Sequence, residues 1–164
     1  MSGAAGKIVS GWGINGVSTF QMGYPLGIAN ASNQTFSFGG GSRPNWAPGA
    51  GPDSVKLGGA AQDRLNRWFN TAAFVAQPAA TFGNIPRTIT AERADGIANW
   101  DFSVFKQTKL NERVGLTFRT EIFNLFNRVQ FAPPGVALGN AQFGVVTGQA
   151  NQPRLVQFAL RLLY

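Results

Sequence analysis

The residue types that most often carry enzyme chemistry are sparse in this chain of 164 residues. It contains no histidine, no cysteine and only seven acidic residues. Their absence excludes Ser-His-Asp and Cys-His catalysis, disulfides, and metal sites built from thiolate or imidazole. Glu92 and Asp95 are close enough in sequence to form a carboxylate pair, but Arg93 between them favours a solvated loop. We therefore expect no enzymatic activity, no cofactor and no bound metal.

A glycine motif near the start of the chain raises the possibility of nucleotide binding. Residues 11–16 read GWGING and fit the G-x-G-x-x-G fingerprint. That fingerprint needs a following helix and an acidic residue about 20 positions later. The next residues, VSTF, are followed by Gly23 and Pro25, and the first acidic residue is Asp53. The motif therefore predicts glycines inside a strand.

The net charge of +7 would suit a nucleic-acid partner, but the 14 basic residues are dispersed. No run of Lys or Arg and no basic helix face is present, so we expect no nucleic-acid partner. Charged residues make up only 13% of the chain, where a soluble domain has about 25%. No stretch reaches the ~18 consecutive apolar residues of a transmembrane helix. This combination favours membrane-crossing strands.

Four segments alternate with the period of a β-strand. Residues 154–164 read RLVQFALRLLY, and one face is wholly apolar: Val156, Phe158, Leu160, Leu162 and Tyr164. Residues 113–126 form the second segment, which has Arg119 and Glu121 on its polar face. The third segment is residues 99–108, and a short polar turn, KLNE, joins it to the second. Residues 8–22 form the fourth segment, as either one strand or a hairpin at Asn15–Gly16.

These segments predict an all-β protein: about four antiparallel strands of a transmembrane β-barrel. A strand of ~9–11 residues crosses the bilayer when tilted, and a charge in lipid costs about 2–4 kcal/mol at the midplane. Arg119, Glu121 and Arg161 are therefore expected to face the lumen. Trp12, Trp100 and Phe126 lie near strand ends, as interfacial aromatics do; a soluble β-sandwich core is the alternative. Residues 30–97 and 127–153 are expected to be long extracellular loops.

Three stretches carry a resemblance to a known family. Residues 99–106 (NWDFSVFK), 116–127 (LTFRTEIFNLFN) and 154–164 resemble the C-terminal end of TonB-dependent outer-membrane receptors, in particular the Oar-like branch. GWGING followed by GYP at residues 23–25 resembles an earlier strand of the same barrels. The stretch FRTEIFNLFN is the more specific part, because an alternating terminal strand is common to outer-membrane proteins.

The resemblance implies that residues 1–164 are the C-terminal portion of a barrel of about 22 strands in the bacterial outer membrane. The function it implies is binding and uptake of a large ligand. The implied partners are outer-membrane lipid and lipopolysaccharide, the rest of the barrel with its plug, the TonB complex through an N-terminal part, and the barrel-assembly machinery. That machinery would recognise Val156, Phe158, Leu160, Leu162 and Tyr164. The alternative is a small self-contained outer-membrane barrel or adhesin with a structural role.

Overall fold

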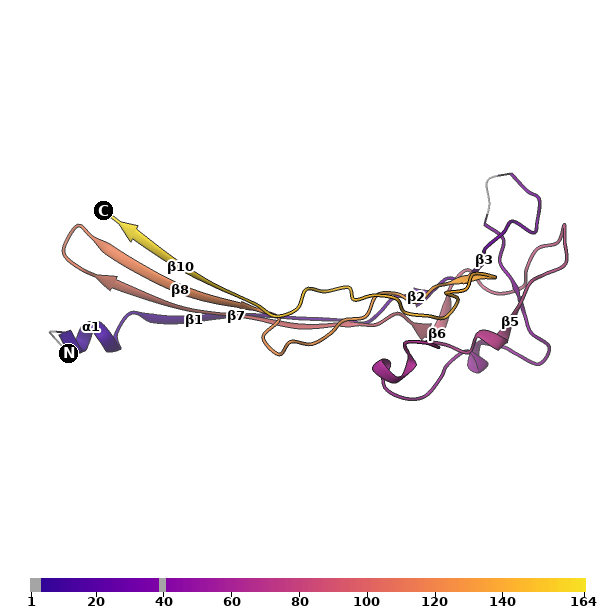
Figure 1. Cartoon of the computed structure of the whole chain (residues 1–164), viewed down its shortest axis with the longest axis horizontal. Helices are drawn as coiled ribbons and strands as arrows, with labels where there is room; N and C mark the ends of the chain where they lie inside the picture. The colour runs from indigo at the N-terminus through magenta and orange to yellow at the C-terminus, as the bar shows by residue number, and fades with distance from the viewer. Residues whose placement is uncertain (1–3, 39–40) are drawn as a thin grey trace. The chain divides into compact units, whose positions relative to one another are not determined.

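The computed structural model describes residues 4–38 and 41–164. Within them the chain divides into two compact units (Figure 1). The sheet unit comprises the chain up to Gln21, Ile97–Val129 and Asn151–Tyr164. The loop unit comprises Met22–Gly96 and Gln130–Ala150. No helix in the described part of the chain has the length and apolar character needed to cross a bilayer.

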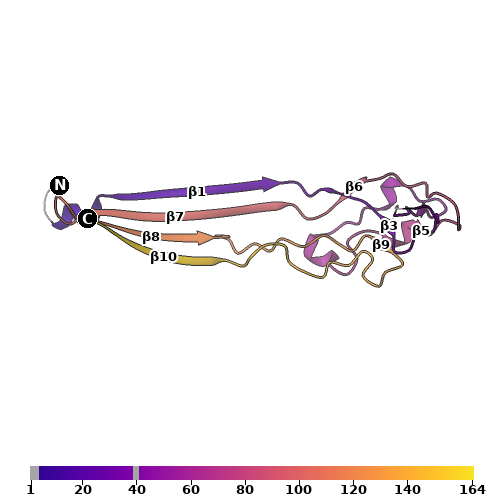
Figure 2. The same ribbon diagram turned by 90° about the horizontal axis from the view of Figure 1, so that it is seen from above.

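The sheet unit is one antiparallel sheet of four strands. They are β1 (Trp12–Gln21), β7 (Ile97–Lys109), β8 (Gly115–Phe123) and β10 (Leu155–Leu163). Their order is β1-β7-β8-β10, so that β1 and β10 form the two edges, as Figure 2 shows. The prediction of an all-β antiparallel fold with about four long strands is confirmed, and the sheet does not close into a barrel.

The register sorts side chains onto two faces by residue number. Residues opposite each other are both even or both odd in all three strand pairs, as in the row Ile14, Val104, Thr120 and Phe158. Even-numbered strand residues form what we call the apolar face, and odd-numbered residues form the polar face. The apolar face carries Trp12, Ile14, Phe20, Trp100, Phe102, Phe118, Ile122, Val156, Leu160 and Leu162, among others.

The start of the chain differs from the predicted strand over residues 8–22. Ile8 and Val9 belong to a short helix, α1 (Ala4–Val9), and β1 begins only at Trp12. Gly11 separates the two elements with φ of +80°, and a Cβ there would lie 2.1 Å from the Gln107 carbonyl oxygen. The strand then continues to Gln21 without a turn at Asn15–Gly16. The hairpin alternative is therefore wrong, because ten successive residues pair with β7.

The ends of the other strands also shift. β8 covers Gly115–Phe123 instead of residues 113–126. Arg113 and Val114 belong to the turn, where their backbone N–H groups donate to the Asn111 side chain at 2.9 and 2.7 Å. Asn124 leaves the strand with φ of +52°, and its backbone N–H donates to Asp101 at 2.9 Å. These side-chain acceptors satisfy backbone donors that the sheet does not use, which ends the strand.

The loop unit is not the irregular loop that its sequence suggested. It contains β2 (Pro25–Leu26) paired with β6 (Ile89–Arg93), β3 (Ala29–Asn30) with β9 (Ala137–Leu138), and β4 (Asn45–Trp46) with β5 (Phe74–Val75). Three 3₁₀ turns connect them: η1 (Pro52–Ser54), η2 (Ala61–Arg64) and η3 (Thr71–Ala73). These elements surround one buried cluster: Leu26, Ile28, Val55, Trp68, Phe69, Ala73, Phe74, Ile85, Ile89 and Ala94. The residues predicted to form long loops thus contain short paired strands and a packed core, and their extracellular placement stays a prediction.

Candidate functional site

The polar face of the sheet holds the predicted lumen-facing residues. Arg119 Nη1 lies 3.5 Å from Glu121 Oε1, and the Gln157 amide donates to the same carboxylate. The Arg119 guanidinium stands 5.8 Å from the centre of the Phe105 ring. β8 contributes Arg119 and Glu121 to this network, and β7 and β10 contribute one member each, Phe105 and Gln157. The register places these residues on two neighbouring rows.

Two hollows flank this network on the polar face. One, of about 280 Å³, extends over β1 and β7 and includes Asp101 and Ser103 among its lining residues. The other, of about 350 Å³, includes Arg161, which lies opposite Thr117 and outside the ion pair. Arg119 and Glu121 line both. The three residues predicted to face the lumen thus share one face, and this face offers charged and amide groups to a polar solute or protein segment.

The predicted interfacial aromatics lie toward opposite ends of the sheet. Trp100 contacts Phe20 and Phe126 edge to face, with ring centroids 5.0 and 5.1 Å apart. Trp12 lies at the other end, where the Lys106 ammonium stands 4.7 Å from the centre of its ring. Trp12 and Trp100 both belong to the apolar face. Their placement at a lipid boundary stays a prediction.

The residues predicted as an assembly signal occupy the edge strand β10. Val156, Phe158, Leu160 and Leu162 lie on the apolar face, and Phe158 and Leu160 are 70% and 69% exposed. Tyr164 follows the strand. Phe158 stacks on Phe118 of β8, with ring centroids 6.3 Å apart. The arrangement combines an apolar face with a backbone edge that has no partner strand in the described sheet, but recognition by another protein stays a prediction.

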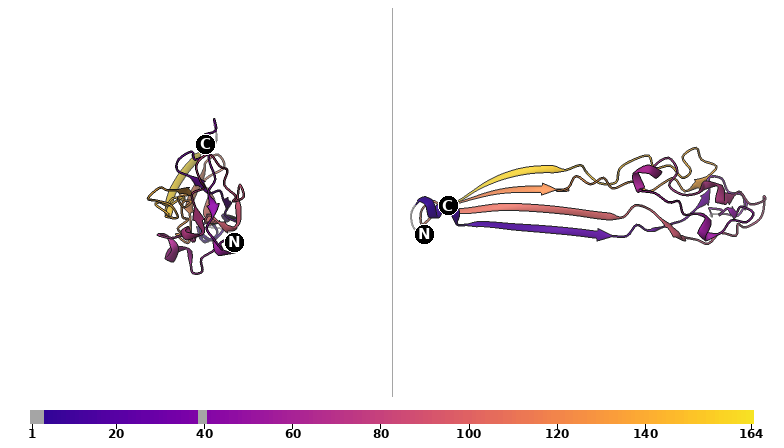
Figure 3. Two further views of the ribbon diagram at one scale, coloured as in Figure 1. Left: turned by 90° about the vertical axis from the view of Figure 1, so that its right-hand side faces the viewer. Right: turned by 90° about the horizontal axis from the view of Figure 1, so that it is seen from below.

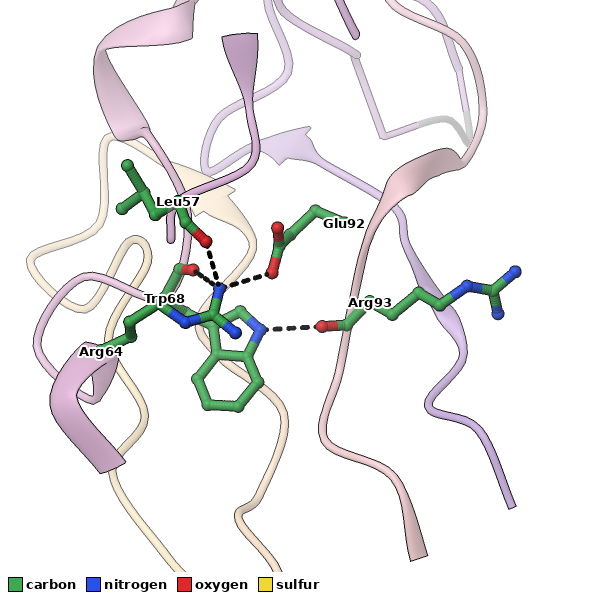
Figure 4. A network of polar contacts seen from close by, with 5 residues as sticks. All are labelled: Leu57, Arg64, Trp68, Glu92 and Arg93. Carbon is green, nitrogen blue, oxygen red and sulfur yellow. Dashed lines mark hydrogen bonds and ion pairs between the residues drawn. The ribbon is translucent and has the colours of Figure 1, made fainter. Parts of the chain in front are cut away.

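The loop unit contains a buried ion pair that the sequence did not reveal (Figure 4). Arg64 Nη1 lies 3.1 Å from Glu92 Oε1, and donates also to the carbonyl oxygens of Leu57 and Trp68 at 3.3 and 3.0 Å. The Trp68 indole N–H donates to the Arg93 carbonyl oxygen at 2.8 Å. The guanidinium carbon of Arg64 stands 4.9 Å from the Trp68 ring centre.

Burial governs the electrostatics of this pair. The expectation that Glu92 is solvated is wrong, because its side chain is only 5% exposed. Burial raises the pKa of the Glu92 carboxyl above its usual value, although Arg64 and Lys56 act in the opposite direction. Asp95, the other member of the suggested carboxylate pair, accepts hydrogen bonds from the backbone of Gly96 and Phe131. Both side chains thus connect segments of the loop unit: Glu92 pairs with Arg64, and Asp95 accepts a hydrogen bond from the Phe131 backbone.

The glycines of the motif at residues 11–16 are part of β1 or lie next to it, and they allow close approach of β7. Gly13 faces Phe105, and a Cβ at Gly13 would lie 2.3 Å from that ring. The segment that would have to be a helix in a dinucleotide site is strand β1. Within the described residues, no group of three or more acidic side chains is close enough to hold a metal ion.

Comparison with known proteins gives one family. The family model described as "Outer membrane beta barrel domain" matches residues 1–157. No curated protein and no solved structure matches the chain significantly.

Proposed function

The chain belongs to the outer-membrane β-barrel domain family and is located in the bacterial outer membrane, and from this premise we propose that it is part of the barrel wall of a TonB-dependent receptor. In this role the apolar face contacts lipid and the polar face lines the lumen. Alternating residues of one strand serve both environments, because successive side chains point to opposite faces.

The observation that carries the proposal is the open four-stranded sheet. Both edge strands present unpaired backbone groups, which are very costly inside a bilayer. Four strands are also too few to enclose a lumen, since small barrels need about eight. Further strands must therefore complete the wall. This requirement favours a segment of a larger receptor over a small self-contained barrel or adhesin.

The sequence resemblance at residues 99–106, 116–127 and 154–164 supplies the finer assignment. Under it, the four strands are the last of a barrel that contains a plug and engages TonB, and the bound solute is large. The loop unit would then lie outside the cell, because barrels have short periplasmic turns and long extracellular loops. The turn between Lys109 and Gly115 would face the periplasm. We include no catalytic reaction in this function.

The barrel-assembly machinery is the partner proposed for β10. An amphipathic strand with an open edge can pair with the edge of another sheet by strand addition. Phe158 and Leu160 would contact lipid in the assembled wall, so their exposure in the isolated sheet is expected.

The test uses the protein as it occurs in outer membranes. We expect the reading frame that contains Met1 to encode a plug upstream, and the purified protein to retain the periplasmic domain of TonB. A matched preparation lacking the upstream segment should not retain it. A heat-modifiable barrel of only these 164 residues, without upstream strands, would overturn the receptor assignment and favour the small barrel.

A further inference from the structure

Lys106 is the exception on the apolar face. It is the one charged residue among the even-numbered positions of the four described strands. Its neighbours in the same row are Trp12, Phe118 and Leu160. A cation at the bilayer midplane costs about 2–4 kcal/mol, and the cost falls to about 0–1 kcal/mol near the interface. The free-energy cost of Lys106 on the apolar face therefore depends on how close this row lies to the membrane interface.

The row lies close to one end of the sheet. Trp12 is the first residue of β1, and Lys106 lies three residues before the end of β7. At ~3.4 Å per residue and a tilt of ~45°, Lys106 lies roughly 7 Å below the strand end. Figure 3 shows α1 and the end of β10 at this same end. The Lys106 backbone therefore lies inside the apolar band. Its side chain extends past the start of β1 to the carbonyl groups of Ile8 and Ser10, which brings the ammonium toward the level of the lipid headgroups.

The ammonium group is held at the surface of the apolar face. Lys106 Nζ donates to the carbonyl oxygens of Ile8 and Ser10 at 2.8 and 2.9 Å, and the Trp12 ring supports it from one side. An ammonium has three N–H donors, so one remains for a further acceptor. No carboxylate of the described residues lies within ion-pair distance of Lys106. The positive charge is thus fixed in place and has no protein counter-ion.

The same end of the sheet is basic overall. Lys7 of α1 donates to the Leu110 carbonyl oxygen at 3.5 Å, and Lys109 and Arg113 flank the turn. Against these four cations, with Lys106 counted, the turn has one acid, Glu112. The resulting field attracts anionic headgroups at the membrane surface.

We propose that Lys106 binds the phosphate of one phospholipid, whose acyl chains lie along the apolar face over Ile14, Val104 and Phe118. Trp12 supports the Lys106 ammonium through its ring, while its indole N–H donates to the Ile8 carbonyl oxygen at 3.0 Å. The occupant must be amphipathic, because the cation lies directly beside an exposed apolar surface. It comes from the inner leaflet, because the short turn identifies this end as periplasmic. The inference rests on the barrel orientation proposed above and not on TonB.

The experiment titrates the delipidated protein, purified from outer membranes in detergent, with phosphatidylglycerol and measures bound lipid by native mass spectrometry. Lys106→Gln should weaken binding about fivefold, as expected for one basic residue at an anionic lipid surface. Lys106→Arg should retain the affinity. Arg161→Gln is the matched control, since it removes a cation from the polar face in the adjacent row; equal losses for both Gln variants would refute the site.

Three compounds test the occupant in the wild-type protein: diacylglycerol, inorganic phosphate and lipopolysaccharide. They keep the proposal testable if Lys106→Gln fails to fold. Diacylglycerol lacks the phosphate and should bind at least fivefold more weakly than phosphatidylglycerol, and inorganic phosphate should not compete. Equal binding of diacylglycerol would overturn the phosphate site. Displacement of phosphatidylglycerol by lipopolysaccharide would overturn the inner-leaflet assignment. Labelling of Leu110→Cys from the periplasm tests the orientation separately, since Leu110 is 49% exposed.

Discussion

Val104→Arg tests the division of the sheet into two faces. Val104 lies in the centre of β7, in a row with Ile14, Thr120 and Phe158. Two rows of the apolar face lie between this row and the end of β7, at Lys106 and Thr108. At ~3.4 Å per residue and a tilt of ~45°, Val104 is roughly 12 Å below that end. This is close to the middle of an apolar band ~25 Å tall.

At this depth an arginine facing lipid should lower the free energy of unfolding by about 2–4 kcal/mol. That loss corresponds to a decrease of roughly 30- to 1,000-fold in the folding equilibrium constant. The measurement is a denaturant titration of the protein folded in lipid vesicles, followed by the shift in gel mobility between folded and unfolded barrel.

Ser103→Arg is the matched control on the adjacent residue. Ser103 belongs to the polar face and lies opposite Glu121, so the new cation gains a carboxylate neighbour and stays out of lipid. We expect this variant to unfold within about 1 kcal/mol of the wild type. Equal destabilisation by the two substitutions, or a larger loss for Ser103→Arg, would refute the assignment of the faces.

Three further predictions concern the loop unit and the edge strand. Trp68→Ala should destabilise the loop unit by about 3–5 kcal/mol, because the Trp68 side chain is only 2% exposed. The loss is measured as a decrease in protease resistance. The control is Phe82→Ala at an 81% exposed site, and an equal effect of this control would contradict the prediction. Burial raises the pKa of Glu92 above 4.5, so its carboxyl favours the folded loop unit below pH 4.5, and this contribution is lost as the pH rises through the raised pKa. The stability of the wild type relative to Glu92→Gln should therefore increase on acidification, by about 1.4 kcal/mol per unit of pKa shift; thermal unfolding at several pH values checks the sign, and a decrease would contradict it. Phe158→Asp, or deletion of Tyr164, should block barrel assembly in cells, and normal surface levels on whole-cell immunoblots would exclude this role.

The sheet could be predicted because each strand carries its own pattern. Alternation in residues 99–108 and 154–164 requires only that successive side chains point to opposite faces. The same local reasoning was wrong at Asn15–Gly16, which has the strongest two-residue turn signal. Pairing of Gly16 with Phe102 in a continuous ladder outweighs that preference. It also missed that Ile8 and Val9 lie in a helix, because a few residues at a strand end fit either period.

The loop unit could not be predicted, because its core is assembled from isolated residues of distant segments. Leu26, Val55, Trp68 and Ile85 are each nearly fully buried, but no period relates them. The burial of Glu92 depends on Arg64, which lies 28 residues earlier in the chain. Neither residue has a local signal that separates a buried pair from two solvated charges.

The sequence alone is enough to derive the antiparallel strands, the apolar face of β10 and the shared face of Arg119, Glu121 and Arg161, because a two-residue period is a local property of the chain. It does not reveal the strand order, the buried Arg64–Glu92 pair or the position of Lys106 beside Trp12. These features depend on which distant segments meet, and therefore on packing and register, which no single stretch of sequence encodes.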